Sequence, residues 1–212
     1  MHTVKKSLTA GILLGLALSA AAQPATDVAP PVYKPGDTWT WAAVVSPRDT
    51  CSAVTTGAKL IQTIESVTPD GFTSDISGPQ AGATTKRVHS KDFSYESKAG
   101  ETSIKSQILN FPLTAGKAWD TSIGSGNVVQ TLSCKSSAIE TLMVGAEQYQ
   151  VVPIVCNGRW KNLSSGNSDQ STFKFWYSPK VGNFVKQTVF TYFRGGTCVD
   201  VEYRLESHKL NP

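Results

Sequence analysis

Histidine is scarce in this chain of 212 residues, which contains three. A Ser–His–acid triad needs a base beside a nucleophile, and many such enzymes carry a Gly-x-Ser-x-Gly elbow, which is missing here. His89 lies in a basic, polar run and His208 lies four residues from the C-terminus, so we predict both on the surface. Asp200, Glu202 and Glu206 share a strand face with Arg204 between them, which is typical of a solvated face. We therefore predict no catalytic residues and no enzymatic activity.

The sequence also has few groups that could hold a metal, a cofactor or a nucleotide. No two of its four cysteines are close together, and no histidine accompanies them at the spacing of a zinc site. His89 and Asp92 form a pair with no third ligand nearby. Gly124-Ser125-Gly126-Asn127 has neither the glycine spacing nor the following helix of a phosphate-binding loop. We predict no metal site and no cofactor.

No apolar run is long enough to span a bilayer. The longest, Leu8–Ala20, follows Lys5 and Lys6 and ends at three alanines, the pattern of a signal peptide. We predict that residues 1–22 are this signal, that the mature chain has no transmembrane segment, and that it is periplasmic or secreted. No cysteine stands at the cleavage region, so we do not expect a lipid anchor there.

The chain also lacks a large excess of charge of either sign. The chain has 20 basic and 16 acidic residues, a net charge of +4, and the predicted signal accounts for two lysines and no acid. The mature chain is therefore close to neutral. A nucleic-acid surface requires a concentrated basic patch, so we predict no nucleic-acid partner.

No segment of the mature chain has the pattern of an amphipathic helix, whereas strand patterns are frequent. Residues 173–205 read as three extended runs separated by Ser178–Gly182 and by Arg194-Gly195-Gly196. In the last run apolar Val199, Val201, Tyr203 and Leu205 alternate with charged residues, which places an apolar face on one side of a strand. This segment predicts a three-stranded antiparallel meander.

Further strands are expected at residues 38–45, 59–67, 72–76, 86–98, 101–109, 128–143 and 147–156, whereas 157–170 is expected to be a loop. Without helices to cover it, a sheet must bury its apolar face against itself. We predict an all-β fold: a single antiparallel, strongly curved sheet or closed β-barrel of about nine or ten strands, with a β-sandwich as the alternative. Residues 23–36 are predicted to be a flexible lead-in, and 37–210 a single β domain.

All four cysteines lie in the exported part, where an even number favours two disulfides. If Val144-Gly145-Ala146 is a hairpin turn, Cys134 and Cys156 are direct cross-strand neighbours, within reach of a disulfide. Pro153 in the second arm predicts an edge strand or a bulge there. The remaining pair, Cys51 and Cys198, would then tie an early loop to the last strand.

The chain has five tryptophans. They either fill the core and its ends, or some of them line a cavity or an exposed groove for an apolar or sugar ligand, whose orientation is set by polar residues at the rim. The candidates for a ligand-binding role are Trp39, Trp41, Trp119 and Trp176.

Four segments resemble the TapB-like proteins, a group of exported β-proteins of bacterial envelopes. They are Tyr33–Trp41, Phe111–Trp119, Glu140–Tyr149 and Trp176–Lys186. The resemblance implies an exported, barrel-like domain without catalytic activity, and it supplies no site residues.

These observations lead to a predicted function. We expect a non-catalytic envelope protein that binds an apolar ligand or a partner protein. The alternatives are a structural or assembly protein with an exposed strand edge, and a hydrolase without a recognisable motif.

Overall fold

The computed structural model describes residues 27–45, 54–78, 84–192 and 198–212, which contain thirteen strands and no helix. The strands are β1 (Thr38–Val45), β2 (Val54–Thr68), β3 (Gly71–Ser77), β4 (Thr85–Ser90), β5 (Tyr95–Ala99), β6 (Thr102–Ser106), β7 (Ala118–Ser125), β8 (Val128–Ser136), β9 (Glu140–Val144), β10 (Glu147–Asn162), β11 (Ser168–Ser178), β12 (Asn183–Tyr192) and β13 (Cys198–Lys209).

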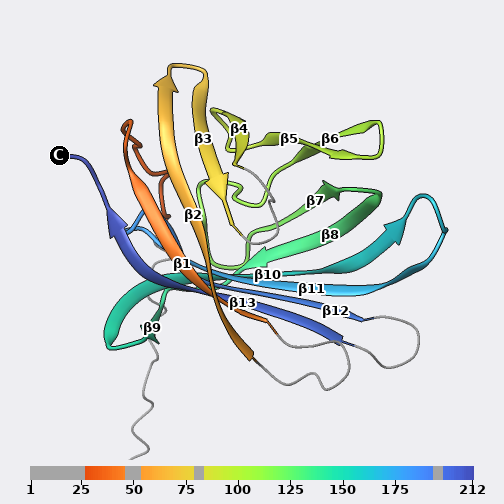
Figure 1. Cartoon of the computed structure of the whole chain (residues 1–212). Helices are drawn as coiled ribbons and strands as arrows, with labels where there is room; N and C mark the ends of the chain where they lie inside the picture. Colours follow the sequence, from red (N-terminus) through yellow and green to blue (C-terminus); the bar gives the residue numbers. More distant parts are fainter. Residues whose placement is uncertain (1–26, 46–53, 79–83, 193–197) are drawn as a thin grey trace, which may run out of the picture.

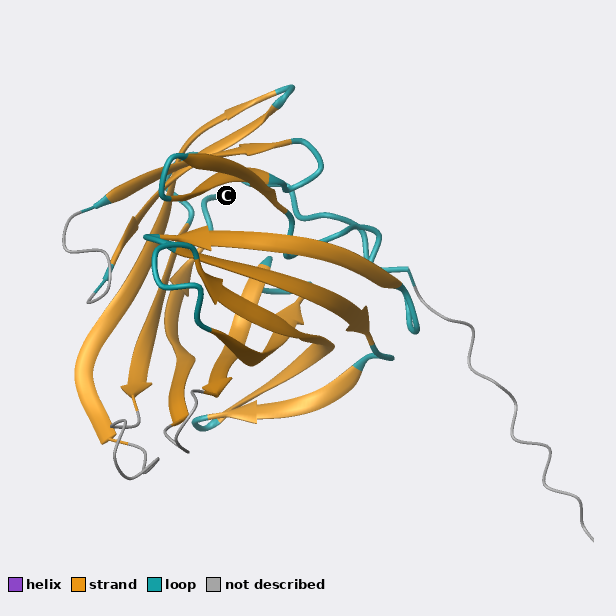
Figure 2. Ribbon diagram, turned by 90° about the vertical axis from the view of Figure 1, so that its right-hand side faces the viewer, coloured by secondary structure: helices purple, strands orange, loops and turns teal. Residues whose placement is uncertain are grey.

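The strands form one antiparallel sheet that curls almost into a barrel (Figures 1 and 2). Its order is β6-β5-β4-β3-β2-β1-β13-β12-β11-β10-β8-β7, and β9 pairs with β10 outside this path. The predicted all-β, barrel-like fold and the meander of β11, β12 and β13 are confirmed. Because the sheet curves, its apolar face is enclosed and buried from water.

The number of strands is larger than predicted for three reasons. A turn at residues 91–94 divides the expected strand 86–98 into β4 and β5, and residues 137–139 divide 128–143 into β8 and β9. β7 lies between residues 110 and 127, where no strand was expected. The predicted loop at 157–170 is wrong for most of its length, because β10 continues to Asn162 and β11 begins at Ser168. In this part of β10, exposed Asn157 and Arg159 alternate with half-buried Gly158 and buried Trp160, the period of a strand.

The disulfide between Cys134 and Cys156 is confirmed, and the two residues face each other on β8 and β10. The partner of β10 changes from β9 to β8 at Pro153, where the ladder shifts by one residue: Glu147 faces Val144, but Ile154 faces Ser136. The predicted irregularity at Pro153 is therefore present, although β10 is an inner strand with β11 on its other side. Cys51, and with it the predicted Cys51–Cys198 disulfide, lies outside the described residues.

The two ends of the sheet, at β6 and β7, meet through single hydrogen bonds and close contacts and not through a regular ladder. The Gly124 amide donates to Ser97 Oγ at 2.8 Å, and the Gln107 amide donates to Thr121 Oγ1 at 2.9 Å. β5 approaches β7 so closely that a Cβ atom on Gly124 would lie 2.6 Å from the Lys98 carbonyl. A glycine is required at this point of contact.

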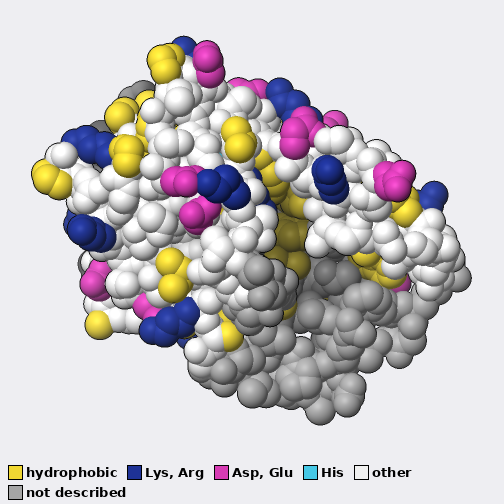
Figure 3. Space-filling view, turned by 45° about the horizontal axis from the view of Figure 1, so that its top comes forward, with side chains coloured by type: hydrophobic (Ala, Val, Ile, Leu, Met, Phe, Trp, Pro, Cys, Tyr) yellow, Lys and Arg dark blue, Asp and Glu magenta, His cyan; other side chains and the backbone are white. Residues whose placement is uncertain are grey.

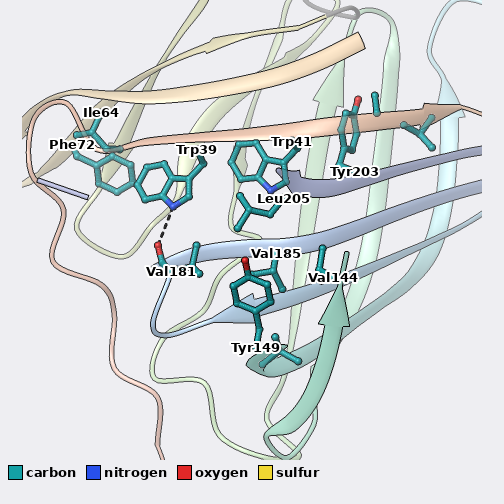
Figure 4. Close-up of a cluster of buried hydrophobic side chains, with 13 residues drawn as sticks. Trp39, Trp41, Ile64, Phe72, Val144, Tyr149, Val181, Val185, Tyr203 and Leu205 are labelled. Atoms are coloured by element: carbon teal, nitrogen blue, oxygen red, sulfur yellow. Dashed lines mark hydrogen bonds between the residues drawn. The ribbon is translucent and has the colours of Figure 1, made fainter. Parts of the chain in front are cut away.

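Side chains of β1 close the end of the barrel at the β11–β12 turn (Figure 4). Trp39 Nε1 donates to the Val181 carbonyl at 2.9 Å, and Trp41 Nε1 donates to the Phe184 carbonyl at 2.7 Å. Tyr33 Oη donates to the Gly182 carbonyl at 2.8 Å. Two of the segments that resemble the TapB-like proteins thus bind each other, and each buried ring nitrogen or hydroxyl has an acceptor, as such groups require.

The described part of the lead-in lies against the barrel. Val28 is buried and exchanges two backbone hydrogen bonds with Leu113, at 3.0 and 2.9 Å. Thr114 Oγ1 donates to Asp27 Oδ1 at 2.6 Å. From Asp27 onward, the segment 23–36 is extended and has specific contacts with residues more than 80 positions away.

Two groups of buried side chains make the core. One lies around Trp39, Trp41 and Val185 beside the β11–β12 turn, and the other lies around Trp119, the disulfide and Ile154 on β7, β8 and β10. Val189 and Phe93 contact both groups. Between the two groups the interior is not filled.

Candidate functional site

The barrel contains a cavity of ≈ 440 Å³. Ten strands, the lead-in, the turn at 91–94 and the segment after β6 supply its lining residues: Tyr33, Trp41, Leu60, Gln62, Phe72, Ile76, Arg87, His89, Phe93, Tyr95, Ile108, Leu109, Ile123, Gly124, Ser125, Gln130, Phe173, Phe175, Asn183, Phe184, Gln187, Val189, Val201 and Tyr203. Figure 3 shows a hollow with hydrophobic side chains inside it, between surfaces made largely of backbone and side chains that are neither hydrophobic nor charged. The volume falls within the range of small-molecule pockets.

Aromatic rings supply much of the apolar wall. Phe93 contacts Phe72 and Phe111 with ring centroids 5.4 and 4.9 Å apart. On the opposite wall Phe184 contacts Phe175 at 4.9 Å. Edge-to-face and tilted pairs of this kind hold rings in fixed positions. The apolar wall is therefore largely preformed.

The turn that carries Phe93 is held in an uncommon conformation. Phe93 has a φ of 63°, a left-handed value that a bulky residue rarely adopts. Asp92 Oδ1 accepts hydrogen bonds from Ser90 Oγ at 2.7 Å and from Ser94 Oγ at 2.6 Å, and these contacts hold the pKa of Asp92 well below its ordinary value. Lys105 adds an ion pair to Asp92 at 3.0 Å. Together these contacts aim the Phe93 ring into the barrel, and strain of this kind is frequent at ligand sites.

A row of polar side chains crosses one wall of the cavity. Asn183 Nδ2 donates to Gln62 Oε1 at 3.2 Å, and Gln62 Nε2 donates to Ser74 Oγ at 3.2 Å. Ser74 Oγ lies 3.4 Å from His89 Nε2. Each of these four side chains thus has a partner within the protein, so the row links β4, β3, β2 and β12 across the interior without a ligand.

His89 is half-buried in the cavity wall, so the prediction that it lies on the surface is wrong. Its ring stacks on Phe72 with centroids 4.3 Å apart and lies 5.3 Å from the ring of Tyr95. Sequence reasoning missed this because β4 does not alternate in the usual way: Arg87 and His89 lie on its inner face, whereas the apolar Val88 is exposed. His208 is exposed, as predicted.

The stability of the protein is expected to depend on the protonation of His89. Burial, followed by the charge of Arg87, lowers the pKa of His89 from 6.5 to about 4. Below its ordinary pKa the unfolded chain binds a proton at this position, whereas the folded chain binds it only near pH 4. The contribution of His89 is therefore complete above pH 6.5 and is lost as the pH falls to about 4. We expect the free energy of unfolding to fall by about 2 kcal/mol over this window.

Urea unfolding at several pH values tests this expectation in the wild-type protein and in His89→Phe. The variant keeps the stacked ring but cannot titrate, so its stability should change less across the same window. Equal pH dependence of both proteins would contradict the assignment.

Two polar residues of the cavity lining, Arg87 and Gln130, are not part of the hydrogen-bonded row. The Arg87 guanidinium lies 4.2 Å from the centroid of the Tyr95 ring and has no carboxylate partner among the described residues. Gln130 Oε1 on β8 is buried and has no hydrogen-bond partner within the described protein. A buried acceptor without a partner costs about 1–3 kcal/mol, which a donor on a ligand would recover.

The four tryptophans predicted to bind a ligand lie in different parts of the structure. Trp41 lines the cavity. Trp39 is fully buried beside the β11–β12 turn, and Trp119 packs in the group that holds the disulfide. Trp176 is half-buried with Lys186 Nζ 5.2 Å from the centroid of its ring. A role in ligand binding thus remains a prediction, and its geometric basis is the position of Trp41.

Within the described ranges, no group of three or more metal-binding side chains occurs, and no helix is long and apolar enough to cross a membrane.

Comparison with solved structures supports the fold. A lipoprotein candidate from Parabacteroides distasonis aligns with a TM-score of 0.53 and 13% sequence identity, covering 88% of this chain and all of its own. The hypothetical lipoprotein YmcC from Escherichia coli aligns with a TM-score of 0.33 and 14% identity over 84% of this chain and 85% of its own. No family model and no curated protein matches the sequence. The resemblance to TapB-like proteins therefore stays a prediction, while the Parabacteroides structure has a similar β fold.

Proposed function

We propose that this protein is a non-catalytic carrier that holds an apolar or amphipathic small molecule inside its barrel. The observation that carries the proposal is the ≈ 440 Å³ cavity, with its preformed aromatic wall and few polar groups. Ligand sites are concave, mostly apolar and largely formed before the ligand binds. The unpartnered Gln130 Oε1 in the lining further supports a ligand that donates a hydrogen bond.

The chemistry of the lining favours binding over catalysis. Ser74 Oγ and His89 Nε2 are near each other, but Ser74 is fully buried and already bonded to Gln62. With a pKa of about 4, His89 would be a weak base for activating a hydroxyl group at neutral pH. The residues that line the cavity include no aspartate or glutamate to orient the imidazole.

We further propose that the carrier works outside the cytoplasm, in the cell envelope or beyond it. The Cys134–Cys156 disulfide supports this location, because such bonds persist mainly in oxidising compartments. The predicted signal at residues 1–22 points the same way.

Filling the cavity tests the proposal. Val189 lies on the inner face of β12 opposite Phe173, and its replacement by tryptophan places an indole in the space for the ligand. We expect Val189→Trp to weaken the binding of the neutral fluorophore N-phenyl-1-naphthylamine by at least about tenfold, a change of about 1.4 kcal/mol. Fluorescence titration measures the effect.

The matched control is Thr188→Trp, which adds the same side chain one position away. Thr188 does not line the cavity, so this variant should bind the fluorophore within about twofold of the wild type. The proposal is wrong if the wild type does not bind, or if the two variants behave alike.

Native mass spectrometry of the protein purified from its own source complements the titration. A retained small molecule supports the carrier. A retained protein chain would instead favour the assembly alternative, for which β9 is the relevant edge. In the described residues β9 pairs with β10 alone, and Met143 on it is 58% exposed.

A further inference from the structure

We propose that the ligand is an amphiphile with a single anionic oxygen headgroup, a carboxylate or a phosphate monoester, and that Arg87 binds this headgroup at the mouth of the cavity. This inference rests on the proposed function and adds the chemical class of the ligand. It depends on the weak pairing of β4 with β5, on the surroundings of Arg87 and on the charge of the cavity lining.

Along the strand order, β4 and β5 are the neighbouring strands with the fewest paired residues. Neighbouring strands elsewhere in the path are joined by five or more residue pairs, whereas β4 and β5 share the pair His89–Tyr95 alone. An outer depression lies over the same strands. Phe72, Arg87, His89 and Tyr95 line both this depression and the interior cavity. The cavity therefore adjoins the surface depression at these four residues, and the proposed mouth lies here.

Arg87 stands at this mouth with its hydrogen-bond donors unused. Its guanidinium lies over the ring of Tyr95, 4.2 Å from the centroid, and no described side chain or backbone group accepts a hydrogen bond from it. Neighbouring lysines are different, because Lys86 pairs with Glu65 and Lys105 pairs with Asp92. An aromatic face holds a guanidinium in place while its edge donors stay open to a planar anion.

The lining has the charge balance of an anion site. Among the described residues of the lining, Arg87 and His89 are the two basic side chains, and none is acidic. His89 is uncharged at neutral pH because burial lowers its pKa to about 4. The formal charge of the lining is thus that of one guanidinium. Partial burial strengthens the attraction of this group for an anion and its repulsion of a cation.

The four polar side chains of the row do not compete for the headgroup. Asn183, Gln62, Ser74 and His89 bond to one another in the row across the wall. Inward from Arg87 the apolar rings of Phe72 and Phe93 come first, and Phe173 and Val189 lie on the opposite wall. An apolar chain attached to the headgroup would extend along these side chains. One unused cation at the opening and an apolar interior match a molecule with one acidic end.

Isothermal titration calorimetry at neutral pH, with ligands that share one chain and differ in headgroup, tests the inference. We expect the wild type to bind decanoate and decyl phosphate at least about tenfold more tightly than decanol, because a charge-assisted bidentate contact contributes that much. Decylamine should bind more weakly than decanol. The relative affinities of decanoate and decyl phosphate distinguish the two headgroups.

Three variants separate the role of Arg87 from general electrostatics and from folding. Arg87→Gln should lose the preference for decanoate over decanol while it still binds decanol and N-phenyl-1-naphthylamine. Arg87→Lys should retain part of the preference. Lys86→Gln removes the same charge at the adjacent position, outside the cavity lining, and should keep the full preference.

The inference is overturned if the wild type binds decanol as tightly as decanoate, or if Arg87→Gln and Lys86→Gln lose the preference equally. In either case binding of the neutral fluorophore would leave the carrier function standing. Absence of binding by every one of these compounds would overturn both proposals.

Discussion

Replacing Trp39 with alanine is expected to lower the free energy of unfolding by about 3–5 kcal/mol, the range for a fully buried large aromatic residue. Trp39 is 0% exposed, and its ring contacts Tyr33 with centroids 5.4 Å apart. The substitution also removes the donor to the Val181 carbonyl, which would then be buried without a partner. Since typical domains are stable by about 5–15 kcal/mol, the variant should unfold at a much lower urea concentration.

Trp176→Ala provides a control of the same residue type. Trp176 is half-buried and its ring lies near the Lys186 amine, so its loss should cost about 1–2 kcal/mol. Circular dichroism is the appropriate probe, because each variant changes the tryptophan fluorescence. If Trp39→Ala is no less stable than Trp176→Ala, the contacts of Trp39 at the end of the barrel contribute less to the free energy of unfolding than we expect.

Removal of the disulfide should have the next largest effect. The double variant Cys134→Ala, Cys156→Ala opens a loop closed across a sequence separation of 22 residues. Loop entropy gives a loss of about 3 kcal/mol for a loop of this length. Both cysteines are buried beside Trp119 and Leu132, so the smaller alanines add a packing loss.

Dithiothreitol separates the two contributions to this loss. The reductant should destabilise the wild type in thermal unfolding by more than it destabilises the double variant, which retains only the predicted Cys51–Cys198 disulfide. A double variant as stable as the oxidised wild type would show that the β8–β10 ladder alone maintains this part of the barrel.

Local pattern was sufficient to predict those parts of the fold in which the two faces of a strand differ. Val201, Tyr203 and Leu205 alternate with charged residues, and this alternation placed β13 correctly. The curvature followed from the absence of helices. The Cys134–Cys156 pair was predicted from a three-residue turn at 144–146. The turn is one residue shorter, and the one-residue shift at Pro153 compensates for this, so that the two cysteines still face each other.

The cavity could not be predicted in the same way, because its wall combines residues from the whole length of the chain. Tyr33 and Phe184 both lie in it, although about 150 residues separate them. The inward direction of His89 and Arg87 depends on their pairing with Phe72 and Ser74 on β3. The one local signal that could have indicated the turn at Phe93 is the serine, aspartate and serine at positions 90, 92 and 94, whose side chains bond to one another.

The pairing of β1 has a consequence for how the chain is made. One edge of β1 is occupied by β2, which follows it closely, but the other is occupied by β13, more than 150 positions later. During synthesis from the amino end, β1 therefore lacks one of its two partner strands until β13 has been made. Long-range pairing of this kind folds slowly. Such a delay would keep the chain unfolded during the export that we propose for it.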